Sequence, residues 1–185
     1  MDIQLPGTFL IGGLLLLTIL NMNIKILETN SINFLNTIAQ ETAADIDTII
    51  EYDLSKIGYS VSSTVNPIIV FNDSVLTFLT DVDADQSIDT ISFYLSTTAA
   101  VAATDNPRDR YLYRTENGSE LDVALGITDW EISYLDRDGN QVSQAEDIIM
   151  IKISYVVETM IGYDETYGRA VWECGFVPKN LGIVL

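Results

Sequence analysis

The segment LPGTFLIGGLLLLTIL, residues 5–20, contains no charged side chain. Apolar surface contributes roughly 25 cal/mol per Å² when it is removed from water, so a helix of this composition cannot stay exposed in a soluble monomer. Either lipid or other protein must cover it. Every fold that this chain can adopt therefore has to leave the segment available for a membrane or for a partner.

The flanking residues decide whether this segment is a removable signal peptide. The preceding MDIQLPG has no basic residue, and the following NMNIKILETN has no small-residue cleavage site. We therefore expect the segment to stay attached to the protein. As a helix it reaches roughly 24 Å, a little less than the roughly 30 Å hydrocarbon core of a bilayer, so it would span a membrane only marginally.

The helical pattern continues well beyond Leu20. Apolar residues recur three, four or seven positions apart, and no proline occurs between Pro6 and Pro67. The pattern predicts one helix to about Ile57, with Gly58 as its C-terminal stop. The sequence also allows a bend or local break of this helix near residues 21–23 or 30–31. The recurring apolar positions are Ile24, Leu27, Phe34, Leu35, Ile38, Ala39, Ile46, Ile49, Ile50, Leu54 and Ile57.

After Tyr59 the apolar period changes to two, which is typical of β-strands. The clearest example is MIKISYVVE, and turn clusters such as ENGS and DRDGN separate the candidates. Strands that follow one long helix predict an α+β fold, with an antiparallel β-sheet packed on the amphipathic half of the helix. We expect an N-terminal assembly or membrane helix over 1–60 and a globular sheet domain over 61–185. The predicted strands are 68–71, 75–79, 90–95, 110–114, 121–125, 130–135, 148–157 and 170–176.

Charge and composition exclude several classes of function. The formal net charge is −18 and only −1 of it lies in the first 40 residues, so the later part repels phosphate backbones and we expect no nucleic-acid partner. There is no histidine, which removes the usual general base and the commonest zinc ligand. Cys174 is the single cysteine, so a disulfide within the chain is impossible. We expect a protein that is not an enzyme and that requires no cofactor.

The segment TDVDADQSIDTISF contains a candidate calcium site. Asp81, Asp83, Asp85 and Asp89 occupy positions 1, 3, 5 and 9 of a calcium-loop pattern, and alternating carboxylates can converge on one hard cation. Two residues depart from the pattern. Gln86 replaces the turn glycine, and Ser92 stands where a bidentate glutamate would close the site. A solvated acidic hairpin is the alternative.

Four motifs resemble those of one protein family. IIEYDLSKIGYSV resembles the end of the long helix in type IV pilin-like proteins, specifically the PilW-like minor pilins and pseudopilins, and NPRDRYLYR, LGITDWEISYLDRDGN and VPKNL follow in the family's order. The resemblance implies a helix that assembles with other copies and a sheet domain on its inner face. The family's usual glutamate at the fifth mature position is missing. Gly12 stands there if Gly7 is the glycine at the cleavage point, and Leu5 stands there if Met1 begins the mature chain.

The apolar helix and the resemblance together predict a structural subunit of an extracellular pilus-like filament. The expected partners are other copies of the chain, a membrane before assembly, and a pilus or secretion assembly machinery, with an inner-membrane intermediate before the cell surface. Two alternatives stay open: a minor pseudopilin that primes or caps such a system, and a membrane-anchored binding module with a single span. The predicted assembly interface is Phe9, Leu10, Ile11, Leu14, Leu15, Leu16, Leu17, Ile19, Leu20, Ile24 and Leu27.

Overall fold

The structure, a computed structural model, describes residues 4–181 and begins with one long helix, α1 (Gln4–Ser55). The helix is continuous, and neither of the two interruptions considered from the sequence occurs. It ends two residues before the predicted Ile57. Gly58 follows with φ +76, and a Cβ there would lie 2.7 Å from the Asn180 carbonyl oxygen, so only glycine fits this stop. The outer limits of the two predicted regions, at residues 1 and 185, lie outside the described residues.

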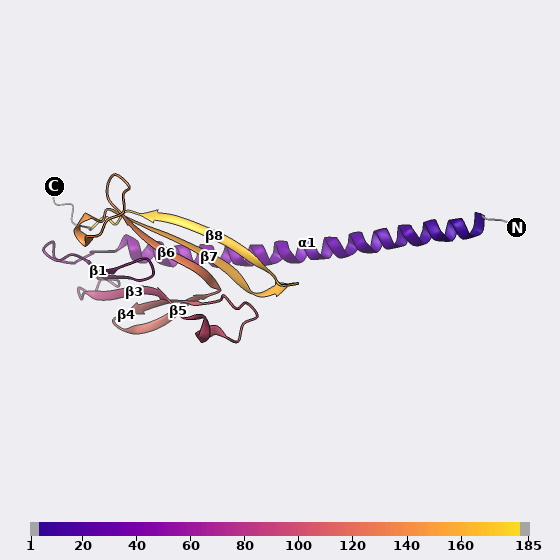
Figure 1. Ribbon diagram of the computed structural model, residues 1–185. Helices are drawn as coiled ribbons and strands as arrows, with labels where there is room; N and C mark the ends of the chain where they lie inside the picture. Colours follow the sequence, from indigo (N-terminus) through magenta and orange to yellow (C-terminus); the bar gives the residue numbers. More distant parts are fainter. Residues whose placement is uncertain (1–3, 182–185) are drawn as a thin grey trace.

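Eight antiparallel strands follow the helix, and every predicted strand is present (Figure 1). The α+β class is therefore confirmed. The sequence predicted one sheet, but the structure has a five-stranded sheet in the order β1-β2-β3-β4-β5 and a three-stranded sheet in the order β6-β7-β8. The strands are β1 (Ile68–Phe71), β2 (Leu76–Thr80), β3 (Asp89–Leu95), β4 (Tyr111–Glu116), β5 (Ser119–Leu125), β6 (Ile127–Leu135), β7 (Met150–Tyr163) and β8 (Thr166–Phe176).

The division into two sheets takes place at Gly126, between β5 and β6. Its φ is +100, and a Cβ there would lie 2.5 Å from the Glu158 carbonyl oxygen. A side chain cannot occupy this position, so glycine lets the chain turn out of the first sheet while it touches β7. The Gly126 N–H donates to the carbonyl of Arg110, and the N–H of Glu158 donates to the carbonyl of Gly126. This crossing therefore ties the two sheets together.

The second half of α1 packs on the three-stranded sheet, mainly on β7 and β8 (Figure 1). Small residues allow the close approach: Ala39 and Ala43 are buried, and a Cβ on Gly168 would lie 2.2 Å from the Leu35 carbonyl carbon. The Tyr155 hydroxyl donates to the Ala43 carbonyl at 2.8 Å. The buried helix positions repeat at three- and four-residue intervals, as predicted for an amphipathic helix. They are Leu35, Ala39, Ala43, Ile46, Ile50 and Leu54.

A buried ion pair joins the end of the helix to the five-stranded sheet. Arg114 on β4 donates from Nε to the Asp53 carboxylate at 2.5 Å and from Nη1 to Glu116 at 2.7 Å. The side chains of Asp53 and Arg114 are only 2% and 13% exposed. Burial raises the pKa of Asp53 more than the hydrogen bond from Arg114 lowers it. The pair therefore fixes the helix to the sheet while it holds a carboxylate away from water.

Replacing Arg114 with methionine is expected to lower the free energy of unfolding by about 3 kcal/mol at neutral pH, because a buried carboxylate loses its cation. The loss should shrink in acid. The pKa of Asp53 is higher in the folded than in the unfolded protein, so the free energy of unfolding falls as pH rises through the folded pKa. Without Arg114 the folded pKa of Asp53 rises further, and the free energy of unfolding continues to fall up to a higher pH. Chemical denaturation across pH measures this. Glu116→Gln, at a 41% exposed side chain, serves as the control and should cost under about 1 kcal/mol. An equal loss at every pH would contradict the assignment.

Candidate functional site

The first half of α1 projects from the globular body (Figure 1), and every residue from 7 to 27 is exposed, whereas Ser31 and Ile32 are half-buried. We call residues 7–34 the stem. All of the predicted interface residues lie on it and all are exposed, from 48% at Leu20 to 78% at Phe9. Three further large apolar residues of the stem, Met22, Ile26 and Phe34, are exposed as well and were not among the predicted set. The complete predicted set is Phe9, Leu10, Ile11, Leu14, Leu15, Leu16, Leu17, Ile19, Leu20, Ile24 and Leu27.

The apolar surface surrounds the stem on every side over residues 7–20. Leu14, Leu15, Leu16 and Leu17 are consecutive, and four consecutive helical residues point in directions about 100° apart. A cylinder with the length of the whole stem, roughly 42 Å, and about 10 Å in diameter has a lateral area of about 1,300 Å², polar side chains included, which is more than the roughly 800 Å² that one partner contributes to a standard interface. One neighbour on one face would leave most of this surface in water.

Two hydroxyl groups on the stem are hydrogen-bonded within the helix itself. Thr18 donates its hydroxyl to the Leu14 carbonyl at 2.8 Å, and Ser31 donates to the Leu27 carbonyl at 2.9 Å. These hydroxyls are satisfied inside the helix and tolerate an apolar environment. Lys25 and Glu28 are the only charged residues of the stem. The stem thus has a net charge of zero, in contrast to the acidic domain that it carries.

By length and composition α1 is able to cross a membrane, and the apolar part of it is not buried inside the fold. A signal sequence near the N-terminus passes the same test. The structure therefore supports a hydrophobic N-terminal helix that is compatible with membrane association. It leaves two possible environments for the stem, which are lipid and the stems of other molecules.

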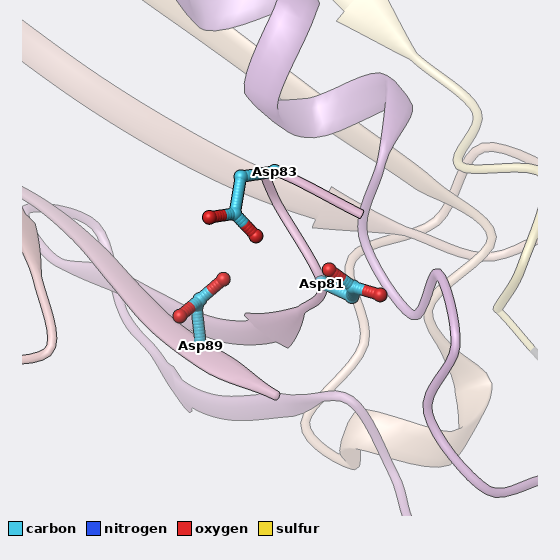
Figure 2. Close-up of side chains that lie close together, drawn as sticks. All are labelled: Asp81, Asp83 and Asp89. Carbon is cyan, nitrogen blue, oxygen red and sulfur yellow. The ribbon is translucent and has the colours of Figure 1, made fainter. Parts of the chain in front are cut away.

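The acidic loop between β2 and β3 brings together three of the four predicted calcium ligands. Carboxylate oxygens of Asp81, Asp83 and Asp89 lie within 4.8 Å of one another (Figure 2). Asp81 and Asp89 are buried, at 2% and 8% exposure, while Asp83 is exposed. Backbone N–H groups of Asp85 and Gln86 donate to the two Asp81 oxygens, both at 3.1 Å. The loop backbone therefore holds the carboxylates close together.

The remaining positions of the calcium-loop pattern are used differently. Asp85 is not part of the three-carboxylate group, and its side chain accepts from the Ser87 N–H at 2.7 Å. Gln86 adopts φ +73 at the position where the pattern has glycine. Ser92 lies on β3, where its hydroxyl pairs with Thr77 at 2.9 Å. Three carboxylates offer up to six of the six to eight oxygens that calcium takes, so water would have to complete the shell. Calcium at this loop stays a prediction.

We expect 1 mM calcium to raise the melting temperature by about 3 °C or more if the three carboxylates hold the ion. Asp83→Asn should abolish this rise without lowering the melting temperature in chelator, because Asp83 is exposed and accepts a single backbone hydrogen bond. Asp138→Asn, in another exposed turn, is the matched control. Differential scanning calorimetry with calcium, magnesium and chelator makes the comparison. Equal calcium responses in both variants would assign the effect to general charge screening.

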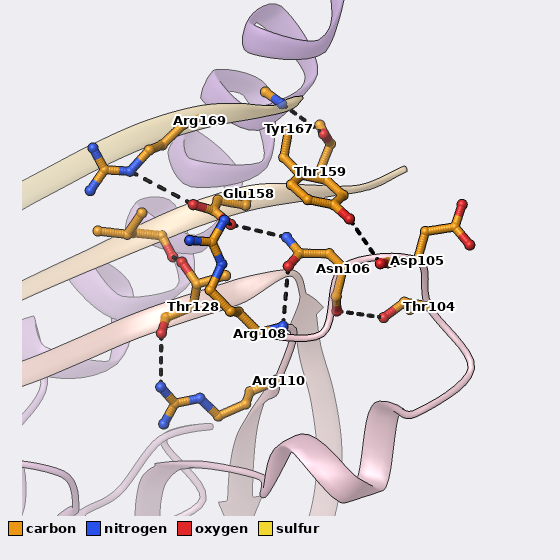
Figure 3. A network of polar contacts seen from close by, with 12 residues as sticks. Thr104, Asp105, Asn106, Arg108, Arg110, Thr128, Glu158, Thr159, Tyr167 and Arg169 are labelled. Atoms are coloured by element: carbon orange, nitrogen blue, oxygen red, sulfur yellow. Dashed lines mark hydrogen bonds and ion pairs between the residues drawn. The ribbon is translucent and has the colours of Figure 1, made fainter. Parts of the chain in front are cut away.

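A second polar cluster was not predicted from the sequence. Glu158, with a side chain only 7% exposed, lies between Arg108 at 2.7 Å and Arg169 at 3.8 Å, and Asn106 donates to it at 3.0 Å (Figure 3). Tyr167 donates its hydroxyl to the Asp105 carbonyl at 2.8 Å. These contacts attach the loop before β4 to the hairpin of β7 and β8. In the sequence this loop was marked only by the motif NPRDRYLYR, and Glu158 lies about 50 residues later in the chain.

No protein-family model, no curated protein and no solved structure matches this chain. The resemblance to type IV pilin-like proteins therefore stays a prediction from the motifs. The Asp53 of the first motif and the Arg114 of the second form the buried ion pair described above. The stem is the feature of the described residues with the largest uncovered apolar surface, and it is the candidate functional site.

Proposed function

We propose that this protein is a structural subunit of an extracellular pilus-like filament and that it polymerises through the stem. One observation carries the proposal: an apolar helix is uncovered on every side and is attached rigidly to a folded acidic domain. Removing that surface from water is a large driving force for association. The motifs that resemble PilW-like pilins support the same function.

The shape of the molecule favours an open polymer over a closed dimer. A stem that is apolar all round needs several neighbours, and contacts between different faces of identical chains generate helical filaments when the rotation does not close. The acidic domains then form the outer coat. Their charge keeps the fibre soluble and opposes side-by-side association of fibres.

Before assembly the stem requires another cover, and lipid is the natural one. In a bilayer Lys25, together with Asn21 and Asn23, would lie at the polar interface next to the apolar segment. The proposed route is an inner-membrane intermediate that a pilus or secretion machinery passes into a fibre at the cell surface. A minor pseudopilin, present at the start or end of such a fibre, would use the same stem at much lower abundance.

A single-span membrane anchor for a binding module is the competing function, and the membrane-compatible composition of α1 is the observation that favours it. An anchored module would stay a monomer or small oligomer in detergent. It would not form fibres when the detergent is removed.

Leu15→Asp in the full-length chain is expected to raise the critical concentration for assembly at least about a hundredfold, because a carboxylate would have to be buried among apolar helices. Leu121→Asp is the matched control, because Leu121 is 59% exposed and Leu15 is 60% exposed, but Leu121 lies on β5 outside the stem. Assembly is followed by sedimentation and electron microscopy after detergent removal. Unchanged melting of the domain in both variants confirms that the fold is intact.

Two results would count against the proposal. Normal fibres from the Leu15→Asp chain would show that the stem is not the assembly surface. A wild-type chain that forms only small oligomers after detergent removal, and that inserts into lipid vesicles as monomers, would favour the anchored module.

A further inference from the structure

The hairpin of β7 and β8 extends along α1 toward the stem (Figure 1). Its last residues, 160–165, are called the hairpin tip. The apolar side chains of the tip are exposed, with Ile161 at 63%, Met160 at 47% and Tyr163 at 39%. The sequence predicted a strand only to residue 157, so this extension was not anticipated. Between 39% and 63% of the surface of each of these side chains is left uncovered by the described residues of the same chain.

Two carboxylates stand at the turn of the hairpin tip. Asp164 and Glu165 have φ values of 49° and 61°, which are left-handed conformations that two-residue hairpins usually fill with asparagine and glycine. A glutamate in that conformation is disfavoured. The hairpin thus presents two negative charges next to exposed apolar side chains.

The stem carries a shallow groove that complements this tip. Its lining residues are Asn21, Met22, Lys25, Ile26, Thr29 and Asn30. Met22 and Ile26 expose apolar surface, at 64% and 46%. Lys25 is the single basic residue of the stem and forms no ion pair within the described residues 4–181. The groove therefore places a cation beside apolar side chains, and this arrangement complements the hairpin tip, where carboxylates lie beside apolar side chains.

We propose that the hairpin tip of one copy docks in the stem groove of another copy, with Ile161 against Met22 and Ile26 and with Asp164 or Glu165 paired with Lys25. The inference rests on the proposed function and names the contact between subunits that accompanies packing of the stems. In this contact the hairpin tip and Lys25 hold neighbouring subunits together, in addition to the packing of the apolar stems.

Charge favours the stem of a second copy as the surface that receives the hairpin tip. The acidic domains repel the hairpin tip of a neighbour, whereas the stem is neutral and has one unpaired cation. Several other cations are already paired with carboxylates of their own chain, namely Arg108, Arg114, Lys152 and Arg169. The hairpin meets its own helix farther along, where Gly168 contacts Leu35 and the Arg169 N–H donates to Asn36 at 3.0 Å. No ion pair joins Asp164 or Glu165 to Lys25 within the described part of one chain.

Disulfide crosslinking between two differently tagged full-length chains tests the contact directly. Both chains carry Cys174→Ala; one carries Ile26→Cys and the other carries Ile161→Cys. They are mixed in detergent, assembled by detergent removal and oxidised with copper phenanthroline. A crosslinked pair that contains both tags is expected only in the fibre fraction. Leu121→Cys replaces Ile161→Cys in the matched control, because these residues are 59% and 63% exposed.

A charge exchange provides a second readout. Lys25→Glu is expected to raise the critical concentration about fivefold, and adding Glu165→Lys should recover most of that change. Lys179→Glu, at an exposed lysine outside the stem, is the control and should leave the critical concentration unchanged. Thermal melting of each variant checks that the hairpin still folds.

The outcomes separate this inference from the proposed function. Wild-type fibres that give no Ile26–Ile161 crosslink, or as much crosslink from the Leu121→Cys control, would overturn the docking and leave the filament intact. Equal effects of Lys25→Glu and Lys179→Glu would overturn it as well. Failure of the wild-type chain to form fibres would overturn the proposed function, and the docking would fall with it.

Discussion

The rest of the structure depends on how the apolar surface of one long helix is covered. The protein covers the second half of α1 with its own strands and leaves the first half without any cover from the described residues. Burial increases gradually along the helix: residues 7–27 are exposed, Ser31 and Ile32 are half-buried, and Leu35 is the first buried residue. A folded domain is thus attached to a surface that only lipid or other molecules can bury.

The second half of α1 attaches the stem to the globular domain. Glycine at 168 and alanines at 39 and 43 bring β7 and β8 close to the helix backbone, and the Asp53–Arg114 pair attaches the end of the helix to the other sheet. Both sheets therefore contact the same helix. Because α1 is continuous, with no proline between Pro6 and Pro67, the orientation of the domain sets the direction of the stem. A stem fixed in this way is suited to repeating the same contact in every copy.

The sequence was sufficient to predict those helices and strands whose apolar residues recur with a clear period. Alternation in MIKISYVVE identified the central strand, and the apolar spacing identified most of the buried face of the helix; Phe34 and Ile49 of that pattern are exposed, and the buried Ala43 was not part of it. Long-range contacts were not predictable. The Asp53–Arg114 pair joins residues 61 positions apart, and the separation into two sheets depends on the close approach of Gly126 to Glu158. The extension of β7 past Val157 was missed because Asp164 and Glu165 are not usual residues for a hairpin turn.

For the candidate sites as well, local features were predicted from the sequence and long-range contacts were not. All of the predicted interface residues lie exposed on the stem, because an uncharged apolar run is a local property of the sequence, whereas the exposed Met22, Ile26 and Phe34 were not in the predicted set. The acidic loop was predicted only in part: Asp81, Asp83 and Asp89 converge, whereas Asp85 and Ser92 make other contacts, and backbone conformation decides which. The Glu158 cluster and the hairpin tip require knowledge of which strands lie side by side.

Whether the stem is buried by copies of the same chain is tested most directly on native material. Filaments sheared from the source cells are imaged by electron microscopy, and the same fraction is analysed by mass spectrometry, including the N-terminal peptide. The account predicts that this chain is the dominant protein of a fibre whose core consists of packed helices. Its presence only in the membrane fraction, with no fibre that contains it in quantity, would contradict a structural filament subunit and favour an anchored module or a minor priming component.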